Sequence, residues 1–256
     1  MDFNSGMGAV QRRMAQTQEG AGRRKATFEA LCISAGQHVL DLGCGGGHLL
    51  RDLALSVGSK GRAVGLDPSE PQINAAKELC KELDNVEFSQ DSATRLSFAD
   101  DAFHSVASIQ VLEYIPDVDA ALAEVQRVLK PAGRFVSVSV LWDHWRFHGP
   151  EPKLNEQMHE AFKAHCSHQM LPLQMPAKLA RHGFVGAQCT PIGFMNNSLH
   201  HNSFAWLASS LLSHFAQKQG IPKADVERWR AQLDQAAEDG RFGFVSMPVL
   251  TTAIAR

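Results

Sequence analysis

The sequence of 256 residues has no apolar stretch approaching the ~18 residues that a membrane span requires. Its opening segment, MDFNSGMGAVQRRMAQTQEGAGRRK, is polar and lacks the apolar region of a secretory signal. The sequence therefore gives no indication of export or of a membrane anchor, and we expect a cytoplasmic protein.

Cysteine is scarce, and neither sign of charge dominates. The five cysteines lie far apart and form no C-x-x-C pair, which favours reduced thiols over a disulfide framework. A formal charge of −2 provides no basic field for a nucleic-acid backbone, so we expect no nucleic-acid partner. With 44% hydrophobic residues the chain can bury a sizeable core, and we expect one domain over residues 1–256. Nothing in the sequence indicates the oligomeric state.

Between residues 38 and 140, short β-branched runs alternate with segments of helical length. This alternation predicts βαβ crossovers and an α/β fold with a mostly parallel sheet and helices on both faces. Before it, residues 7–33 predict one or two helices that break near Gly20 and Gly22. The strands are expected at 38–42, 62–67, 86–90, 103–109 and 134–140, with helices at 46–57, 69–83 and 117–130.

The regular alternation ends after residue 141. A segment rich in Trp, His and Pro extends to about residue 170, and a short helix follows to 182. We expect a strand at 184–192, helices at 198–219 and 222–238, and a final strand at 242–255. The two strands are expected to pair antiparallel at the sheet edge. Residues 142–170 and 196–240 are expected to form helical lid insertions that cover the substrate.

The stretch VLDLGCGGGH, residues 39–48, places bare backbone just after the first expected strand. Glycine at this position allows a ligand to approach closely and directs helix N–H groups at it. A dinucleotide fingerprint would require glycine or alanine where His48 stands, and a phosphate-binding loop would require a lysine that is absent. What remains is the pattern Asp41-x-Gly43-x-Gly45-x-Gly47.

This pattern resembles the first motif of the class I S-adenosylmethionine-dependent methyltransferases. Three further stretches match that family in order: GLDPS, QDSATRLSF and SIQVLEYIPDVDAALAEVQRVLKPAGRFV. The resemblance covers residues 28–140, which would form the cofactor-binding core. It is closest to the group of quinone-biosynthesis and arsenite-type small-molecule methyltransferases. It implies a Rossmann-like sheet with an antiparallel last strand and S-adenosylmethionine as the cofactor.

The resemblance also implies which residues hold the cofactor. Asp67 matches the acid that binds the ribose hydroxyls, and a carboxylate can accept hydrogen bonds from both hydroxyls at once. Asp91 matches the residue that receives the adenine amino group. The implied cofactor-binding residues are Asp41, Gly43, Cys44, Gly45, Gly47, Asp67, Pro68, Ser69, Asp91, Ser92, Ala93, Gln110 and Leu112.

Two departures from the family pattern are visible. The turn before the fifth strand reads PAG where the family usually has PGG, and Glu113 stands where related sequences often have His. Arsenite would require several thiolates in one place. Cys44 lies in the glycine-rich loop, whereas Cys32 and Cys80 lie in expected helices, so arsenite ranks low as the substrate.

Ligands of open α/β sheets bind at the carboxyl ends of the strands. Because residues 110–114 and 142–148 follow two such ends, Glu113, Tyr114 and His144 are the candidates for catalytic residues that deprotonate an acceptor. Trp142, Trp145 and His148 are the expected substrate contacts, and the tryptophan faces suit an apolar or cationic acceptor. The pairs His144–His148 and His165–His168 lack a third ligand, so no metal site is predicted.

The sequence therefore predicts methyl transfer from S-adenosylmethionine to a nitrogen or oxygen of a small molecule, by direct in-line displacement. Two alternatives remain open. A methyltransferase acting on RNA or protein would require a basic surface beside the pocket, and a non-catalytic S-adenosylmethionine-binding protein would lack space for an acceptor. No motif identifies the acceptor or establishes whether a general base is used.

Overall fold

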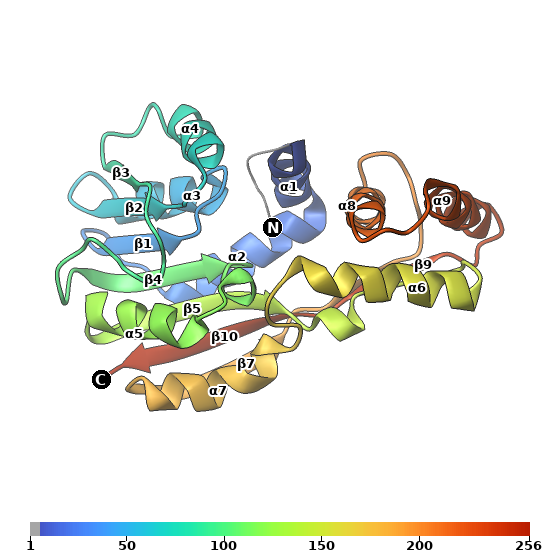
Figure 1. The fold of residues 1–256 in the computed structure, drawn as a ribbon. Helices are drawn as coiled ribbons and strands as arrows, with labels where there is room; N and C mark the ends of the chain where they lie inside the picture. The colour runs from blue at the N-terminus through green and yellow to red at the C-terminus, as the bar shows by residue number, and fades with distance from the viewer. Residues whose placement is uncertain (1–5) are drawn as a thin grey trace.

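The computed structural model describes residues 6–256, which are built around a seven-stranded sheet (Figure 1). Its strand order is β3-β2-β1-β4-β5-β10-β7, and only β10 runs antiparallel to its neighbours. The predicted mostly parallel sheet with an antiparallel last strand is confirmed. The strands are β1 (His38–Leu42), β2 (Arg62–Leu66), β3 (Val86–Ser89), β4 (Phe103–Ile109), β5 (Leu129–Val140), β7 (Phe184–Pro191) and β10 (Pro248–Ala255).

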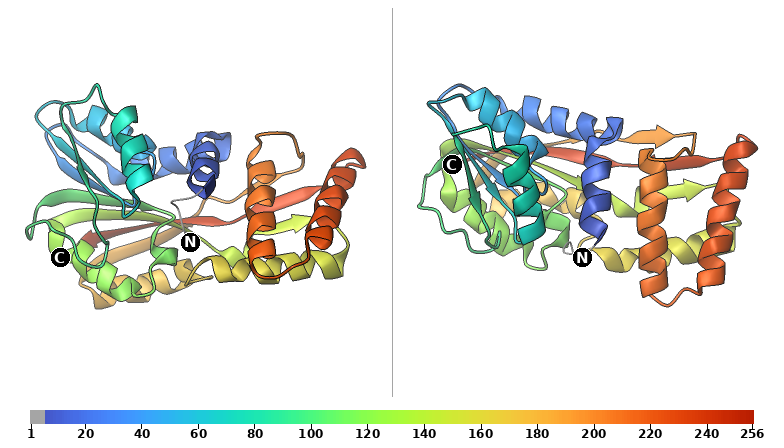
Figure 2. Two further views of the ribbon diagram at one scale, coloured as in Figure 1. Left: turned by 45° about the horizontal axis from the view of Figure 1, so that its top comes forward. Right: turned by 90° about the horizontal axis from the view of Figure 1, so that it is seen from above.

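Helices cover both faces of this sheet, as the sequence predicted (Figure 2). On one face, Leu50 and Leu53 pack in a cluster with strand residues such as Ala63. On the other face, Leu122 belongs to a cluster that includes Phe135. The first face carries α2 (Gln18–Leu31), α3 (His48–Val57) and α4 (Glu70–Leu79), and the second carries α5 (Val118–Val128) and α7 (Leu171–Arg181).

A second, three-stranded antiparallel sheet stands beyond the carboxyl ends of the parallel strands, with the order β6-β9-β8. Three helices pack on it around an apolar cluster that includes Trp145, Phe147, Trp229 and Phe244. Segments 142–170 and 196–240 therefore share one core. The elements are β6 (Arg146–His148), β8 (Phe194–Asn196), β9 (Gly243–Ser246), α6 (Pro152–Phe162), α8 (Phe204–Lys218) and α9 (Lys223–Glu238), with the short 3-10 turns η1 (Leu112–Tyr114), η2 (Trp142–His144) and η3 (Lys163–His165).

The expected single strand over 242–255 is wrong, because Met247 divides it. Met247 accepts a hydrogen bond from the Leu141 N–H over 3.0 Å, and β9 on one side of it joins the small sheet. On the other side β10 pairs with β5 and, as expected, with β7. The helix expected from residue 198 begins at Phe204, behind its N-cap Ser203. No helix among residues 6–256 is long and apolar enough to cross a membrane.

The expected break near Gly20 and Gly22 is also wrong, because α1 (Gly6–Gln16) ends before Thr17 and both glycines lie within α2. The Thr17 hydroxyl caps α2 by accepting a hydrogen bond from the Gly20 N–H over 3.2 Å. A Cβ at Gly20 would lie 2.3 Å from the Met14 carbonyl oxygen, so glycine permits the tight corner. The corner lets α1 lie between α4 and α8 at the edge of the sheet (Figures 1 and 2).

Candidate active site

The glycine-rich loop joins β1 to α3 and is held against β2 and β4. The N–H groups of Gly43 and Cys44 donate to the Leu66 carbonyl over 2.7 and 2.9 Å. Gly43 has φ +75°, and a Cβ there would lie 2.2 Å from Val111. At Gly45, with φ +51°, a Cβ would meet nothing within 4 Å. The loop therefore packs tightly at Gly43 and presents open backbone at Gly45.

Asp67 ties this loop to the end of β2. Its carboxylate accepts hydrogen bonds from the Gly45 N–H over 3.0 Å and from the Ser69 N–H over 2.9 Å. The residue is 9% exposed, and burial raises the pKa of its carboxyl group. Since a carboxylate offers about four acceptor positions, two remain for a ligand.

Asp41 lies in β1 beneath the loop and is 3% exposed. Burial, and secondarily the charge of Asp67, raise the pKa of Asp41 to about 7. Its Oδ2 atom has no hydrogen-bond partner in the part of the chain that the structure describes. A positively charged or hydrogen-bond-donating ligand group would stabilise the ionised carboxylate. Burial also raises the pKa of the neighbouring Cys44 thiol, which keeps it protonated.

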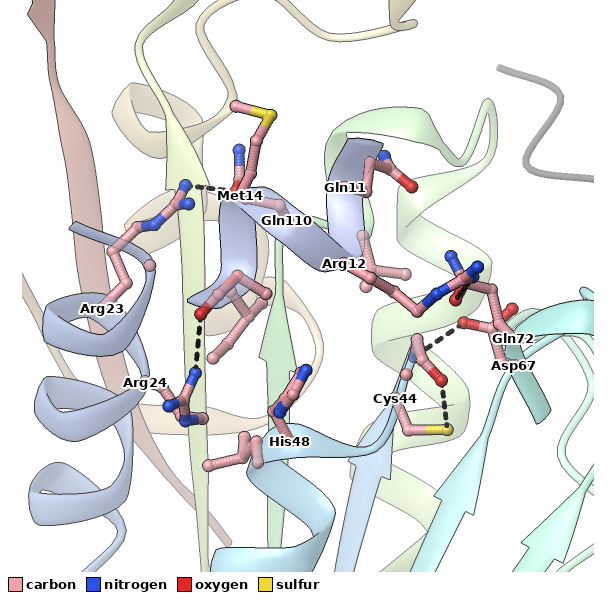
Figure 3. A pocket seen from close by; sticks show the side chains of 18 of the residues that line it. Gln11, Arg12, Met14, Arg23, Arg24, Cys44, His48, Asp67, Gln72 and Gln110 are labelled. Carbon is pink, nitrogen blue, oxygen red and sulfur yellow. Dashed lines mark hydrogen bonds between the residues drawn. The ribbon is translucent and has the colours of Figure 1, made fainter. Parts of the chain in front are cut away.

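A cavity of about 410 Å³ opens at the carboxyl ends of the parallel strands (Figure 3). Its loop half is formed around the glycine-rich loop, and its aromatic half around η1, η2 and α8. Ile109, Gln110 and Val111, at the end of β4 and just after it, also line the cavity. The loop half is lined by Asp41, Gly43, Cys44, Gly45, Gly46, His48, Leu49, Asp67, Pro68 and Gln72, and the aromatic half by Met14, Arg23, Tyr114, Ile115, Trp142, Trp145, Phe204, Leu211 and Ser246.

Helix α1 covers the loop half, and no motif in the sequence predicts this cover. Arg12 donates to the Gln72 side-chain oxygen over 3.0 Å, linking α1 to α4. A Cβ at Gly46 would lie 2.9 Å from the Arg12 Cδ atom, so the arginine stem lies directly on the loop. Figure 3 shows α1 crossing the cavity with Arg12 near Asp67.

Arg23, from α2, is a second residue that sequence reasoning missed. It is 6% exposed, donates to the Gln110 side-chain oxygen, and stands 5.1 Å over the Phe204 ring. Figure 3 places Arg23 and Gln110 on the opposite side of the cavity from Asp67. No motif could have indicated this, because Arg23, Gln110 and Phe204 come from distant parts of the chain.

Tyr114 and Glu113 follow β4 in the turn η1. Tyr114 lines the aromatic half, and burial raises the pKa of its hydroxyl well above 10. Glu113 is 0% exposed, lies outside the cavity lining, and accepts a hydrogen bond from the Ser139 hydroxyl over 2.8 Å. Its backbone carbonyl accepts from the N–H groups of Ser167 and His168. Glu113 thus joins the sheet edge to the segment after α6.

The tryptophans expected to contact the substrate both line the aromatic half. Trp142 packs edge-on against His165 at 4.2 Å, and Trp145 stacks on Phe162 at 4.7 Å between ring centroids. His144 and His148 do not share this position. Both are exposed and lie outside the cavity lining, and His148 pairs with Gly243 of β9.

Several residues implied as cofactor contacts lie outside the cavity lining, and their roles stay predictions. Asp91 is half-buried and accepts a hydrogen bond from the Ser92 N–H over 2.8 Å, in the loop after β3. Within residues 6–256, no group of three or more His, Cys, Asp or Glu side chains is placed to hold a metal ion. The remaining implied contacts outside the lining are Gly47, Ser69, Ser92, Ala93 and Leu112.

Residues 33–201 match the family described as a methyltransferase domain. Together with the strand order, the antiparallel β10 and the motif residues at the carboxyl edge, this match defines the class. The chain belongs to the class I S-adenosylmethionine-dependent methyltransferases.

Two individual proteins illustrate how similar this chain is to known sequences. The chain is 29% identical over 175 residues to an uncharacterised 37.1 kDa protein of a Streptomyces fradiae transposon, covering 68% of this chain and 47% of that protein. It is 39% identical over 117 residues to the demethylmenaquinone methyltransferase of Lactococcus lactis, covering 45% and 46%. The chain thus spans about half the length of the curated relatives it matches.

A solved structure with a similar fold is the geranyl diphosphate C-methyltransferase of Streptomyces coelicolor, in complex with S-adenosylhomocysteine. The TM-score is 0.59 at 16% identity, over 93% of this chain and 76% of that one. At this level of identity the likeness concerns the fold alone.

Proposed function

We propose that this protein transfers the methyl group of S-adenosylmethionine to a nitrogen or oxygen of a small organic acceptor, by direct in-line displacement. The observation that carries the proposal is the single cavity that joins the loop half to the aromatic half. The loop half offers the groups that would bind the cofactor, and the aromatic half offers space for an acceptor beside it.

The loop half fits S-adenosylmethionine. Gly45 leaves space for close approach, Asp67 retains acceptor positions for ribose hydroxyls, and the buried Asp41 oxygen lacks a partner within residues 6–256. Arg12 and the rest of α1 cover this half. When bound, the cofactor supplies an activated methyl group, so the protein's main task is to align the acceptor. Such positioning contributes roughly 7–11 kcal/mol in favourable cases.

The aromatic half would orient the acceptor. Trp142, Trp145 and Phe204 provide flat apolar walls, which favour a planar or apolar molecule. The Tyr114 hydroxyl is protonated at neutral pH, and burial raises its pKa further, so we assign it the role of a hydrogen-bond donor rather than a base. The exposed His144 is not carried into this mechanism.

A small acceptor is favoured over RNA or protein because α1 and α8 both line the cavity and limit the space around the acceptor. The names of a relative and of a structural neighbour, demethylmenaquinone methyltransferase and geranyl diphosphate C-methyltransferase, also denote small acceptors. The second name denotes a carbon acceptor, which is the alternative to nitrogen or oxygen that an acceptor screen should include.

Calorimetry with S-adenosylhomocysteine tests cofactor binding. We expect saturable binding to the wild-type protein and about ten- to hundredfold weaker binding to Asp67→Ala, because hydrogen bonds to a charged group are worth roughly 1.5–3 kcal/mol. The melting temperature should fall only modestly, although two backbone N–H groups lose their acceptor. Asp84→Ala, which removes an exposed acid, is the matched control.

Stronger heat with NAD than with S-adenosylhomocysteine would contradict the proposal. An unchanged dissociation constant with a collapsed melting temperature would show that Asp67 serves the fold alone. Catalysis itself is tested by screening small metabolites for S-adenosylhomocysteine formation. Binding without turnover on any small acceptor, but with turnover on RNA or protein, would favour the macromolecular alternative.

A further inference from the structure

Three side chains lining the aromatic half each hold a buried polar atom without a hydrogen-bond partner in the described part of the chain. These atoms are Arg23 Nε, Trp142 Nε1 and Ser246 Oγ. All three atoms can donate, and the first two can only donate. Buried donors without partners lower stability, and ligand oxygens would relieve that cost. The aromatic half therefore combines apolar walls with a few hydrogen-bond donors. These donors favour a ligand that carries hydrogen-bond-accepting oxygens.

The three residues all line the wall of the aromatic half, and contacts of their neighbours connect them. In β9 the side chains of Phe244 and Ser246 point to the same face, since side chains alternate along a strand. The Phe244 ring stacks on Phe204 at 6.0 Å, and the Arg23 guanidinium stands 5.1 Å over that same Phe204 ring. Trp142 is next to Leu141, whose N–H donates to the carbonyl of Met247, the residue after Ser246.

Arg23 brings a positive charge to this wall that the protein does not neutralise by contact. Its guanidinium donates a hydrogen bond to the neutral side chain of Gln110, and within residues 6–256 it forms no ion pair with a carboxylate. Glu113 and Glu19 act on it from a distance, but their carboxylates accept from Ser139 and Asn196 instead. Burial lowers the pKa of Arg23 to about 10, which leaves the guanidinium charged at neutral pH.

Resting on the proposed function, we infer that the acceptor carries an acidic oxygen group, a carboxylate on an apolar body, and that Arg23 binds this group. The planar fork of arginine suits a carboxylate, and Ser246 and Trp142 add neutral donors beside it. The three unpartnered atoms are covered in the structure, so their side chains must turn slightly for a ligand oxygen to reach them. The same charge disfavours the cationic acceptor that the tryptophan faces alone would accommodate.

Calorimetry with a charged and a neutral probe of one shape tests the inference. With S-adenosylhomocysteine saturating, 2-naphthoate should bind the wild-type protein at least about tenfold more tightly than 2-naphthamide. Arg23→Gln should remove this preference and change S-adenosylhomocysteine affinity by less than about threefold. Lys25→Gln, which removes an exposed charge from the same helix, should keep the preference. Ser246→Ala, which removes an unpartnered hydroxyl, should weaken naphthoate binding several-fold without lowering the melting temperature.

Equal affinity for both probes, or binding of neither in the millimolar range, would overturn the inference. So would an Arg23→Gln protein that keeps its naphthoate affinity but loses affinity for S-adenosylhomocysteine, since Arg23 would then bind the amino-acid end of the cofactor. Failure of the wild-type protein to bind S-adenosylhomocysteine would refute the proposed function itself, and is seen before either probe is added. If Arg23→Gln does not fold, the ratio of the 2-naphthoate affinities of the wild-type and Ser246→Ala proteins tests the inference instead.

Discussion

At the scale of the residue, Glu113 and Asp41 are two acids that the fold keeps away from water. Burial raises the pKa of Glu113 from 4.5 to about 7, and the pKa of Asp41 from 3.8 to about 7. Between those values the folded protein holds protons that the unfolded chain has released. Their stabilising effect is therefore complete below the unfolded pKa values and is lost as the pH rises through about 7.

We predict that the melting temperature of ligand-free Glu113→Gln gains on that of the wild-type protein as the pH rises from about 5 to about 8. The comparison with wild type is needed because the buried His159 and His165, whose pKa values are lowered, act in the opposite direction in both proteins. Each unit of pKa difference corresponds to about 1.4 kcal/mol, and glutamine has no carboxyl group to deprotonate. Differential scanning fluorimetry across the pH range measures both slopes. Parallel curves for the two proteins would mean that Glu113 does not titrate in this range.

At the scale of the element, α1 contacts the glycine-rich loop through Arg12 and helix α8 through Arg13. Arg12 lies on Gly46 and bonds to Gln72, whereas Arg13 is exposed and stands 5.8 Å from the Trp206 ring of α8. The two arginines are adjacent in sequence and carry the same charge. Substituting each arginine separately therefore distinguishes two roles of α1, which are to cover the loop half and to contact α8.

We predict that Arg12→Ala weakens S-adenosylhomocysteine binding by about three- to tenfold with little change in melting temperature. The reason is that one hydrogen bond, worth about 1 kcal/mol, and the cover over Gly46 are both lost. Arg13→Ala should leave the dissociation constant within twofold of wild type. Calorimetry with S-adenosylhomocysteine on the wild-type protein and the two variants measures these changes. Equal changes in the dissociation constant for both substitutions would indicate a general charge effect instead.

The elements also show how much the sequence could establish. Strands β1, β2, β3 and β4 were predictable because each is a β-branched run flanked by helical periodicity. The small sheet was not, because β6 and β8 have three residues each and their partner β9 continues directly into β10. In the same way, motifs identified the loop half, whereas the aromatic half joins Arg23, Phe204 and Ser246 from distant segments.

At the scale of the whole molecule, residues 142–170 and 196–240 stay a predicted mobile cover over the site. They share a core with β9 and contribute Trp142, Trp145, Phe204 and Leu211 to the cavity lining. Figure 1 shows their helices outside the large sheet. We expect hydrogen exchange in these two segments to slow when S-adenosylhomocysteine and an acceptor bind, because covers of this kind become ordered around a ligand. Protection that is uniform without any ligand would instead show a rigid structural unit.

The position of β10 between β5 and β7 has a consequence for how the chain is made. Strand β7 leaves the ribosome well before β10, since residues 192–247 must be synthesised in between. At roughly 5–20 residues per second, that interval lasts several seconds. Throughout it, β5 lacks its neighbour and β7 has no strand to join, so two β edges are open to other nascent chains. Slower synthesis of residues 192–247 is therefore expected to lengthen the time during which these edges can pair with the wrong strand.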